Sequence, residues 1–308
     1  MTSIALDATS SAVQIAAMLS KDLKTAMSSN LTASTDKNSM YKVIANAANA
    51  KLKAAAKAKV PAAMDALNNR FTFEKANCKT AVISTTYSAS QMAAVDSFRK
   101  AVKNKYAFDP SLKTTSFLAA ILWDSISENM EAVLKVINWF SDALTKISAE
   151  SKETKFYITL PNSKKFLFMI NKTMKMENKP LSFFDDVTNF VATEVETDKF
   201  DLTKATRLVA SQFIQSFDAA LAELIVCELD AQNIRVSVNM DSFEVDDKYK
   251  DALRQAARES YFELFSEKDW MNSIRLELEA QSSVKLDAFI PTNDFDISEV
   301  LQSNYLVS

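Results

Sequence analysis

The sequence predicts an α+β fold that is predominantly helical. Long segments repeat apolar residues every three or four positions, which is the pattern of a helix with one buried face. The clearest of these segments covers residues 115–149, where the apolar positions run from Leu118 to Ile147. Two short β-branched or apolar runs, at 3–7 and 235–245, predict buried strands instead. The chain therefore combines many helices with few strands.

The other elements follow from local signals. Pro61 should end or restart the helix before it, because proline has no N–H to donate. Pro161-Asn162-Ser163 lies between two apolar runs and predicts a hairpin, whereas residues 171–202 show no consistent period. In chain order the expected elements are a strand at 3–7, a helix capped by Thr9 or Ser10, a polar connector at 28–38, helices at 39–60, 73–105 and 115–149, a hairpin of 155–160 and 165–170, a helix at 203–229, a strand at 235–245, and helices at 246–265 and 270–281.

Composition excludes several classes of chemistry. A chain of 308 residues with 48% hydrophobic content can bury a sizeable core. The formal net charge of -3 provides no global basic field for nucleic acid, although a cleft needs only local positive charge. The sequence has no histidine, so histidine-based catalysis, histidine–metal ligation and Ser-His-Asp triads are excluded. Two cysteines are too few for a disulfide framework or a Cys-rich zinc site.

The same features predict the compartment. No apolar run approaches the roughly 18 residues of a membrane span. The N-terminus has no basic region, and Asp7 interrupts its apolar start, which is unlike a signal peptide. We expect a cytoplasmic protein that is not secreted and has no membrane partner.

The sequence contains no glycine. Ordinary usage of about 7% would place roughly 22 glycines in a chain of this length. Every left-handed turn and helix C-cap must therefore use another residue at some energetic cost. This composition indicates a redesigned or alphabet-reduced sequence.

Each of the two strand-forming runs delivers an aspartate near its end, Asp7 in the first and Asp241 in the second. Two such carboxylates could hold the pair of cations that phosphoryl transfer uses, one activating the attacking oxygen and one stabilising the leaving oxygen. On spacing alone the alternative is that both are turn or cap residues.

A second group of residues shares one face of the helix that begins near residue 73. Lys75, Lys79, Ile83 and Tyr87 recur every four residues. Lys79 and Tyr87 would lie about 12 Å apart along the axis, which is the scale of a nucleotide from phosphates to sugar. The two cations could bind a triphosphate while the ring packs against a sugar or base. The alternative is two exposed lysines and a half-buried tyrosine.

Taken together, these segments resemble the single-subunit RNA polymerases of bacteriophages and mitochondria. Asp7-Ala-Thr-Ser-Ser-Ala-Val-Gln14 resembles their motif A, the helix with Lys75, Lys79 and Tyr87 resembles motif B, and Met240-Asp241-Ser242-Phe243 resembles motif C. Further stretches agree in order and spacing, namely 120–139 with the long fingers helix, 211–218 with the segment before the last palm strands, and 296–305 with the C-terminal tail. The resemblance covers most of the chain and identifies it with the C-terminal catalytic half.

The resemblance implies a right-hand polymerase fold, with a palm around a small antiparallel sheet and helical fingers. The palm would comprise residues 1–35 and 216–308, and the fingers residues 36–215. It implies that Asp7 and Asp241 bind two Mg²⁺ ions, with the Ala8 carbonyl completing one coordination shell.

The resemblance also implies the substrate contacts. Lys79 would neutralise charge on the triphosphate with help from Lys75, and Tyr87 would lie beside the incoming ribose. Gln215 stands where the family usually has a histidine that contacts the ribose 2′-hydroxyl. The implied partners are a DNA template, the nascent RNA and ribonucleoside triphosphates.

The sequence departs from the family pattern at several positions. Motif B has Lys75 in place of arginine, which loses bidentate phosphate geometry. Alanines replace the motif A glycines, and Met240 replaces the motif C histidine. The chain begins at motif A, so we expect either that a second polypeptide supplies the N-terminal domain and thumb or that the chain is a catalytic-half fragment.

Two other functions stay open. A DNA polymerase of the same superfamily is disfavoured, because motif A has no glutamate after Asp7 and motif C has Ser242 where those enzymes have glutamate. An inactive scaffold that keeps the polymerase fold is favoured by the missing glycines and disfavoured by the retained carboxylates and cations.

Overall fold

The computed structural model describes residues 3–86, 96, 98–103, 112–151, 153–182 and 188–308. Helices dominate these residues, and the strands form three small antiparallel sheets, so the expected fold class is confirmed. The helices are α1 (Ser11–Ser20), α2 (Leu23–Ser28), α3 (Met40–Lys57), α4 (Pro61–Asn68), α5 (Lys75–Thr86), α7 (Leu112–Asn129), α8 (Glu131–Glu150), α9 (Leu202–Ala231), α10 (Lys250–Ser266) and α11 (Trp270–Ser282). Short 3₁₀ helices cover Asp247–Tyr249 and Ile297–Gln302.

The first sheet joins the two ends of the chain. It has the order β1 (Ser3–Asp7), β7 (Ser242–Asp246), β6 (Ser237–Asn239), and every pairing is antiparallel. A second sheet pairs β2 (Lys155–Thr159) with β3 (Lys165–Met169), which is the hairpin expected around Pro161. The third pairs β4 (Lys172–Ser182) with β5 (Thr188–Phe200) in the segment that had no consistent period.

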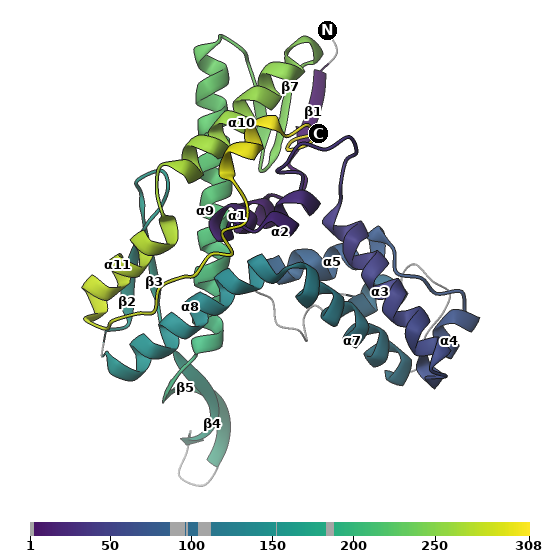
Figure 1. Cartoon of the computed structure of the whole chain (residues 1–308). Coiled ribbons are helices and arrows are strands. Elements are labelled where there is room, and N and C mark those ends of the chain that lie inside the picture. The colour runs from purple at the N-terminus through teal and green to yellow at the C-terminus, as the bar shows by residue number, and fades with distance from the viewer. Residues whose placement is uncertain (1–2, 87–95, 97, 104–111, 152, 183–187) are drawn as a thin grey trace.

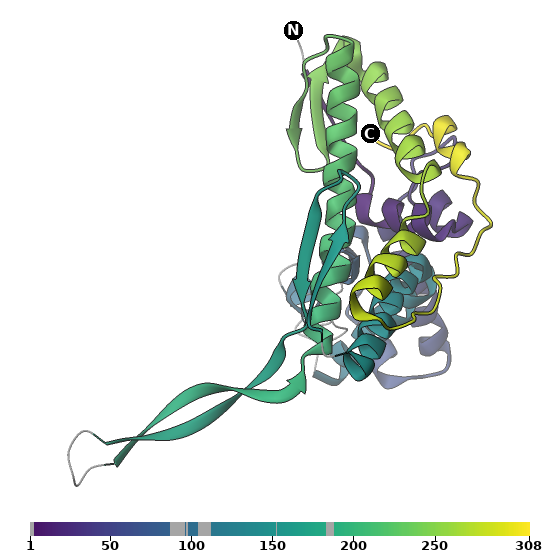
Figure 2. The same ribbon diagram turned by 90° about the vertical axis from the view of Figure 1, so that its left-hand side faces the viewer.

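Helix α9 is the central element of the fold. It runs beside the first two sheets and packs against α1, α8 and α10 (Figures 1 and 2). Among the described residues, α9 alone is long and apolar enough to cross a membrane, but 44% of its most apolar stretch is buried inside the molecule. Phe213, Phe217 and Ile225 on this helix are fully enclosed. We therefore interpret α9 as a core helix.

Two hydrophobic cores meet at α1. The larger core contains side chains of β1, α8, α9, α10 and α11, and the smaller one contains side chains of α3, α4, α5 and α7. All ten residues of α1 are buried. Ile15 and Met18 belong to the larger core, whereas Val13 and Ala16 belong to the smaller one. Helix α1 therefore fixes the two cores against each other. The predicted boundaries after residues 35 and 215 stay predictions.

The expected helix at 115–149 is two helices, which corrects the sequence interpretation. The chain bends at Met130, whose φ of -120° and ψ of 34° are not helical. Met130 is fully buried in the smaller core. Helix α7 packs into that core, while most of α8 packs into the larger one. Apolar spacing continues through the bend because both helices have buried faces, so the period alone does not reveal the break.

The expected strand at 235–245 is also corrected. It is a hairpin in which Met240 and Asp241 form the two-residue turn between β6 and β7. Asp241 therefore lies at a turn and not inside a strand.

Because the chain has no glycine, other residues adopt positive φ angles. Ten described residues other than glycine have positive φ. Lys21, with φ 47°, ends α1 in the left-handed conformation that glycine usually adopts at this position. Ser10 and Met240, with φ of 130° and 56°, lie beside the candidate site described next.

Candidate active site

The first sheet brings the two predicted carboxylates together. Asp7, the last residue of β1, pairs with Ser242, the first residue of β7. Asp241 precedes Ser242, so its turn lies directly beside the end of β1. The Ala8 amide donates a 3.0 Å hydrogen bond to the Asp241 carbonyl oxygen and fixes this arrangement. Residues 234 positions apart in the sequence thus meet at one sheet edge.

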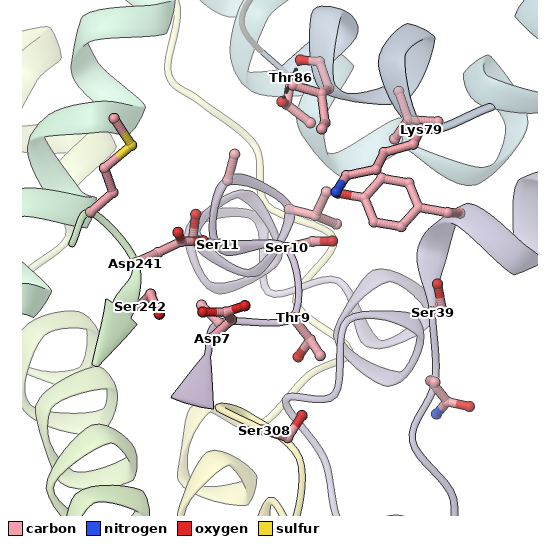
Figure 3. A pocket seen from close by; sticks show the side chains of 18 of the residues that line it. Asp7, Thr9, Ser10, Ser11, Ser39, Lys79, Thr86, Asp241, Ser242 and Ser308 are labelled. Atoms are coloured by element: carbon pink, nitrogen blue, oxygen red, sulfur yellow. Dashed lines mark hydrogen bonds between the residues drawn. The ribbon is translucent and has the colours of Figure 1, made fainter. Parts of the chain in front are cut away.

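Both carboxylates line a cavity of about 670 Å³. Figure 3 shows Asp7 and Asp241 close together, with Lys79 reaching toward the cavity from another element. The lining residues come from β1, α1, the connector before α3, α3, α5, the β6–β7 turn and the end of the chain. They are Asp7, Ala8, Thr9, Ser10, Ser11, Ala12, Val13, Lys37, Asn38, Ser39, Tyr41, Lys75, Lys79, Val82, Ile83, Thr86, Asn239, Met240, Asp241, Ser242 and Ser308.

Helix α5 supplies the basic side of the cavity. Lys75 and Lys79 both line it and are one helical turn apart. The neighbouring side chains of Cys78, Ala81 and Val82 are buried in the smaller core, whereas Lys75 and Lys79 are exposed. The Lys75 ammonium lies 5.9 Å from the centre of the Tyr41 ring. Tyr87, also predicted for this face, lies outside the described residues.

The charges at the cavity act on one another. Burial raises the pKa of the Asp241 carboxyl, its own main-chain amide lowers that pKa, the Asp7 charge raises it, and the Lys79 charge lowers it. Two carboxylates that repel each other beside one cavity are stabilised by a cation between them. Carboxylate and carbonyl oxygens are also the ligands that Mg²⁺ prefers. Asp7, Asp241 and Ala8 thus provide a suitable donor set, although no group of three His, Cys, Asp or Glu side chains among the described residues could hold a metal ion.

Gln215 does not join this group. It is exposed on α9 and does not line the cavity. The proposed contact between Gln215 and a ribose therefore stays a prediction that the geometry does not support.

Asp218, three residues later on α9, is a carboxylate that the sequence interpretation missed. Burial raises its pKa to about 7, a hydrogen bond from Ser11 lowers it, and the Asp241 charge raises it. In the sequence, Asp218 was only the last residue of the 211–218 segment, which resembles the family's segment before the last palm strands. An aspartate in an otherwise apolar helical face is a further signal of a special environment.

A buried hydrogen-bond network supports α1 under the cavity. Gln14 is fully buried, and its amide donates to the main-chain oxygens of Ser29 (2.9 Å) and Leu306 (3.1 Å). The Tyr261 hydroxyl donates to the Gln14 side-chain oxygen at 3.0 Å. The helix that supplies the cavity wall is thereby fastened to three distant segments.

Comparison with known proteins agrees with this architecture. The family model of DNA-dependent RNA polymerase matches residues 1–288. The chain therefore belongs to the DNA-dependent RNA polymerase family, as the motifs predicted.

The chain is also similar to part of a longer curated relative. The mitochondrial DNA-directed RNA polymerase 1 of Arabidopsis thaliana is 20% identical to it over 236 residues. The match covers 74% of this chain and 23% of that relative.

Proposed function

We propose that this chain catalyses nucleotidyl transfer in template-directed RNA synthesis, as the catalytic half or subunit of a single-subunit-type RNA polymerase. One observation carries the proposal. Asp7 and Asp241, from opposite ends of the chain, line the same cavity as Lys75 and Lys79 of α5. Carboxylates for metal ions and cations for a triphosphate are the two groups that this reaction needs.

Each residue then has a role. Asp7 and Asp241 would hold two Mg²⁺ ions, with the Ala8 carbonyl as a further ligand. Such ions, when bound, activate the attacking RNA 3′-oxygen and stabilise the leaving oxygen of pyrophosphate. Lys79 would neutralise charge on the triphosphate and Lys75 would assist. Tyr87 is proposed to lie beside the incoming ribose.

The proposed partners are a DNA template, the nascent RNA, ribonucleoside triphosphates and a second polypeptide that supplies the N-terminal domain and thumb. The chain matches only 23% of the length of the Arabidopsis relative. The cytoplasmic location also stays a prediction.

An inactive scaffold is the second candidate, and a specific observation favours it. Ser10 and Met240 have positive φ and both line the cavity. Left-handed backbone at residues with a Cβ costs about 1–3 kcal/mol. Strain at the cavity wall could move the carboxylates from the geometry that catalysis requires.

Primer extension distinguishes these candidates. The chain, alone and with the N-terminal half of a family member added, would be tested for Mg²⁺-dependent extension of an RNA primer on a DNA template. Ribonucleotide extension that disappears in Asp7→Ala supports the proposed function, and a preference for deoxyribonucleotides would indicate a DNA polymerase. A folded chain that extends no primer in either format would indicate the scaffold.

Asp241→Asn tests the proposed metal ligand more specifically. It should abolish nucleotide addition, because a neutral amide cannot replace a carboxylate metal ligand. It should not weaken folding, because burial already opposes the charge on Asp241. Asp246→Asn, at the other end of β7 and outside the cavity lining, is the matched control and should retain activity. Continued extension by Asp241→Asn would contradict the assignment.

A further inference from the structure

A third lysine lines the cavity from an element other than α5. Lys37 belongs to the connector between α2 and α3 and is exposed at the cavity. Its ammonium group donates a 3.0 Å hydrogen bond to the main-chain oxygen of Ser308. No chemistry was predicted for this connector from the sequence, so Lys37 is an additional basic group of the site.

The connector that carries Lys37 is held in place on both sides. The Asn30 side chain accepts from the Asn38 amide at 2.7 Å and donates to the Asn38 carbonyl at 3.0 Å. On the other side, the Tyr305 hydroxyl donates to the Thr35 carbonyl at 3.1 Å. The backbone beside Lys37 is therefore fixed, while its flexible four-carbon side chain can change partner.

Lys37 lies within electrostatic range of groups on both sides of the cavity. Burial and the charge of Lys75 lower the pKa of Lys37, whereas the charge of Asp7 raises it. Among the described residues, none of Lys37, Lys75 and Lys79 forms an ion pair with an Asp or Glu side chain. Like charges that face one cavity and are not paired with a carboxylate side chain repel each other, and a polyanion bound between them would remove that repulsion.

We propose that Lys37 binds the phosphate groups of the incoming ribonucleoside triphosphate, and of the pyrophosphate product, together with Lys75 and Lys79. This inference rests on the proposed function. The Ser308 oxygen is the partner of Lys37 in this structure, and phosphate oxygens would replace it on binding.

The position of Lys37 also predicts what it contributes. It comes from a different element than Lys75 and Lys79, so three ammonium groups would contact the polyphosphate from two directions. Asp7, which would hold a metal ion, lines the same cavity as Lys37, and its charge raises the pKa of the lysine. Lys37 should therefore affect nucleotide affinity and pyrophosphate release more than the chemical step.

Calorimetric titration of the full chain with inorganic pyrophosphate in excess Mg²⁺ tests this inference. Lys37→Ala should weaken binding by roughly tenfold, the lower end for a charge-assisted contact in an exposed site. Lys37→Arg, which keeps the charge, should bind within about twofold of the unaltered chain. Lys42→Ala is the matched control, because Lys42 is exposed on α3 and does not line the cavity.

Lys79→Ala separates failure of this inference from failure of the proposed function. If Lys79→Ala weakens binding and Lys37→Ala does not, Lys37 only holds the Ser308 segment and the inference is wrong, while the proposed phosphate site stands. If neither variant differs from the unaltered chain, or the unaltered chain binds no pyrophosphate, the phosphate site itself is wrong and the inference fails with it. An equal loss in Lys37→Ala and Lys37→Arg would also overturn the charge-based role.

Discussion

The candidate site and the β4–β5 hairpin are built in opposite ways. The cavity is lined by segments from both ends of the chain and its middle, and most of those segments have one face in a hydrophobic core. The hairpin extends away from the body of the molecule (Figure 2). No residue of 172–179 or 191–200 is buried. Its described contacts are largely its own cross-strand pairs, including the hydroxyls of Thr173 and Thr197 and the 3.4 Å ion pair of Lys172 with Glu196.

The two regions are stabilised by different interactions. Side chains at the cavity are positioned by burial of their neighbours, which is worth about 25 cal/mol per Å² of apolar surface. The hairpin is held only by backbone hydrogen bonds between its strands and by pairs of exposed side chains. An isolated two-stranded hairpin is marginally stable in water. We therefore expect the free energy of unfolding to depend on the residues under the cavity and hardly at all on the hairpin.

The largest effect is expected from Phe217→Ala. Phe217 is fully buried on α9 and contacts the rings of Phe213, Phe265 and Trp270 at centroid distances of 4.9, 5.2 and 5.3 Å. Its loss should lower the free energy of unfolding by about 3–5 kcal/mol.

Met176→Ala on the hairpin is the counterpart of this variant. Met176 is 63% exposed, so its truncation should change the free energy of unfolding by less than about 0.5 kcal/mol. Urea titrations of both variants measure the difference. Similar losses would show that the hairpin is part of the cooperative unit.

The same contrast explains which parts of the fold could be predicted from sequence. Helices α3, α9 and α11 have one buried face, and their bounds were predicted within a few residues. The hairpin has two exposed faces, so no continuous apolar side indicates its period in the sequence. The bend at Met130 was missed because a change of core partner does not interrupt apolar spacing.

Prediction of the site divided in a similar way. Asp7, Asp241, Lys75 and Lys79 were predicted to act together, and the structure places all four at one cavity. Lys37 was missed because a polar connector carries no periodic signal, and its place depends on contacts with residues near 305. The buried environment of Asp218 likewise depends on α1 and the β6–β7 turn, which are remote in sequence.

Asp218→Asn should have the next largest effect, and it should depend on pH. Burial raises the folded-state pKa of Asp218 to about 7, above its ordinary 3.8. The folded chain therefore binds the proton more tightly than the unfolded chain, and its stability falls as the pH rises from about 4 through about 7. At pH 8 the unaltered chain carries the cost of a buried charge, whereas an asparagine would not.

The variant should thus raise the free energy of unfolding at pH 8 by an amount on the order of 2–4 kcal/mol, with little change at pH 4. Urea unfolding at both pH values measures this. Asp230→Asn, at an exposed position on the same helix, is the control and should change neither value by more than about 0.5 kcal/mol. A gain that is equal at both pH values would contradict a raised pKa at Asp218.

The smallest effect is expected from a glycine at the turn that carries Asp241. Met240 has φ of 56° and is 87% exposed, so Met240→Gly removes backbone strain and loses almost no packing. Glycine adopts positive φ without a steric penalty, but it also gains freedom in the unfolded chain, so the net gain should be about 0.5–1 kcal/mol. Met240→Ala keeps the Cβ and should give no gain. If the two variants unfold alike, methionine is not strained at this turn, and the backbone beside Asp241 then offers no support for an inactive scaffold.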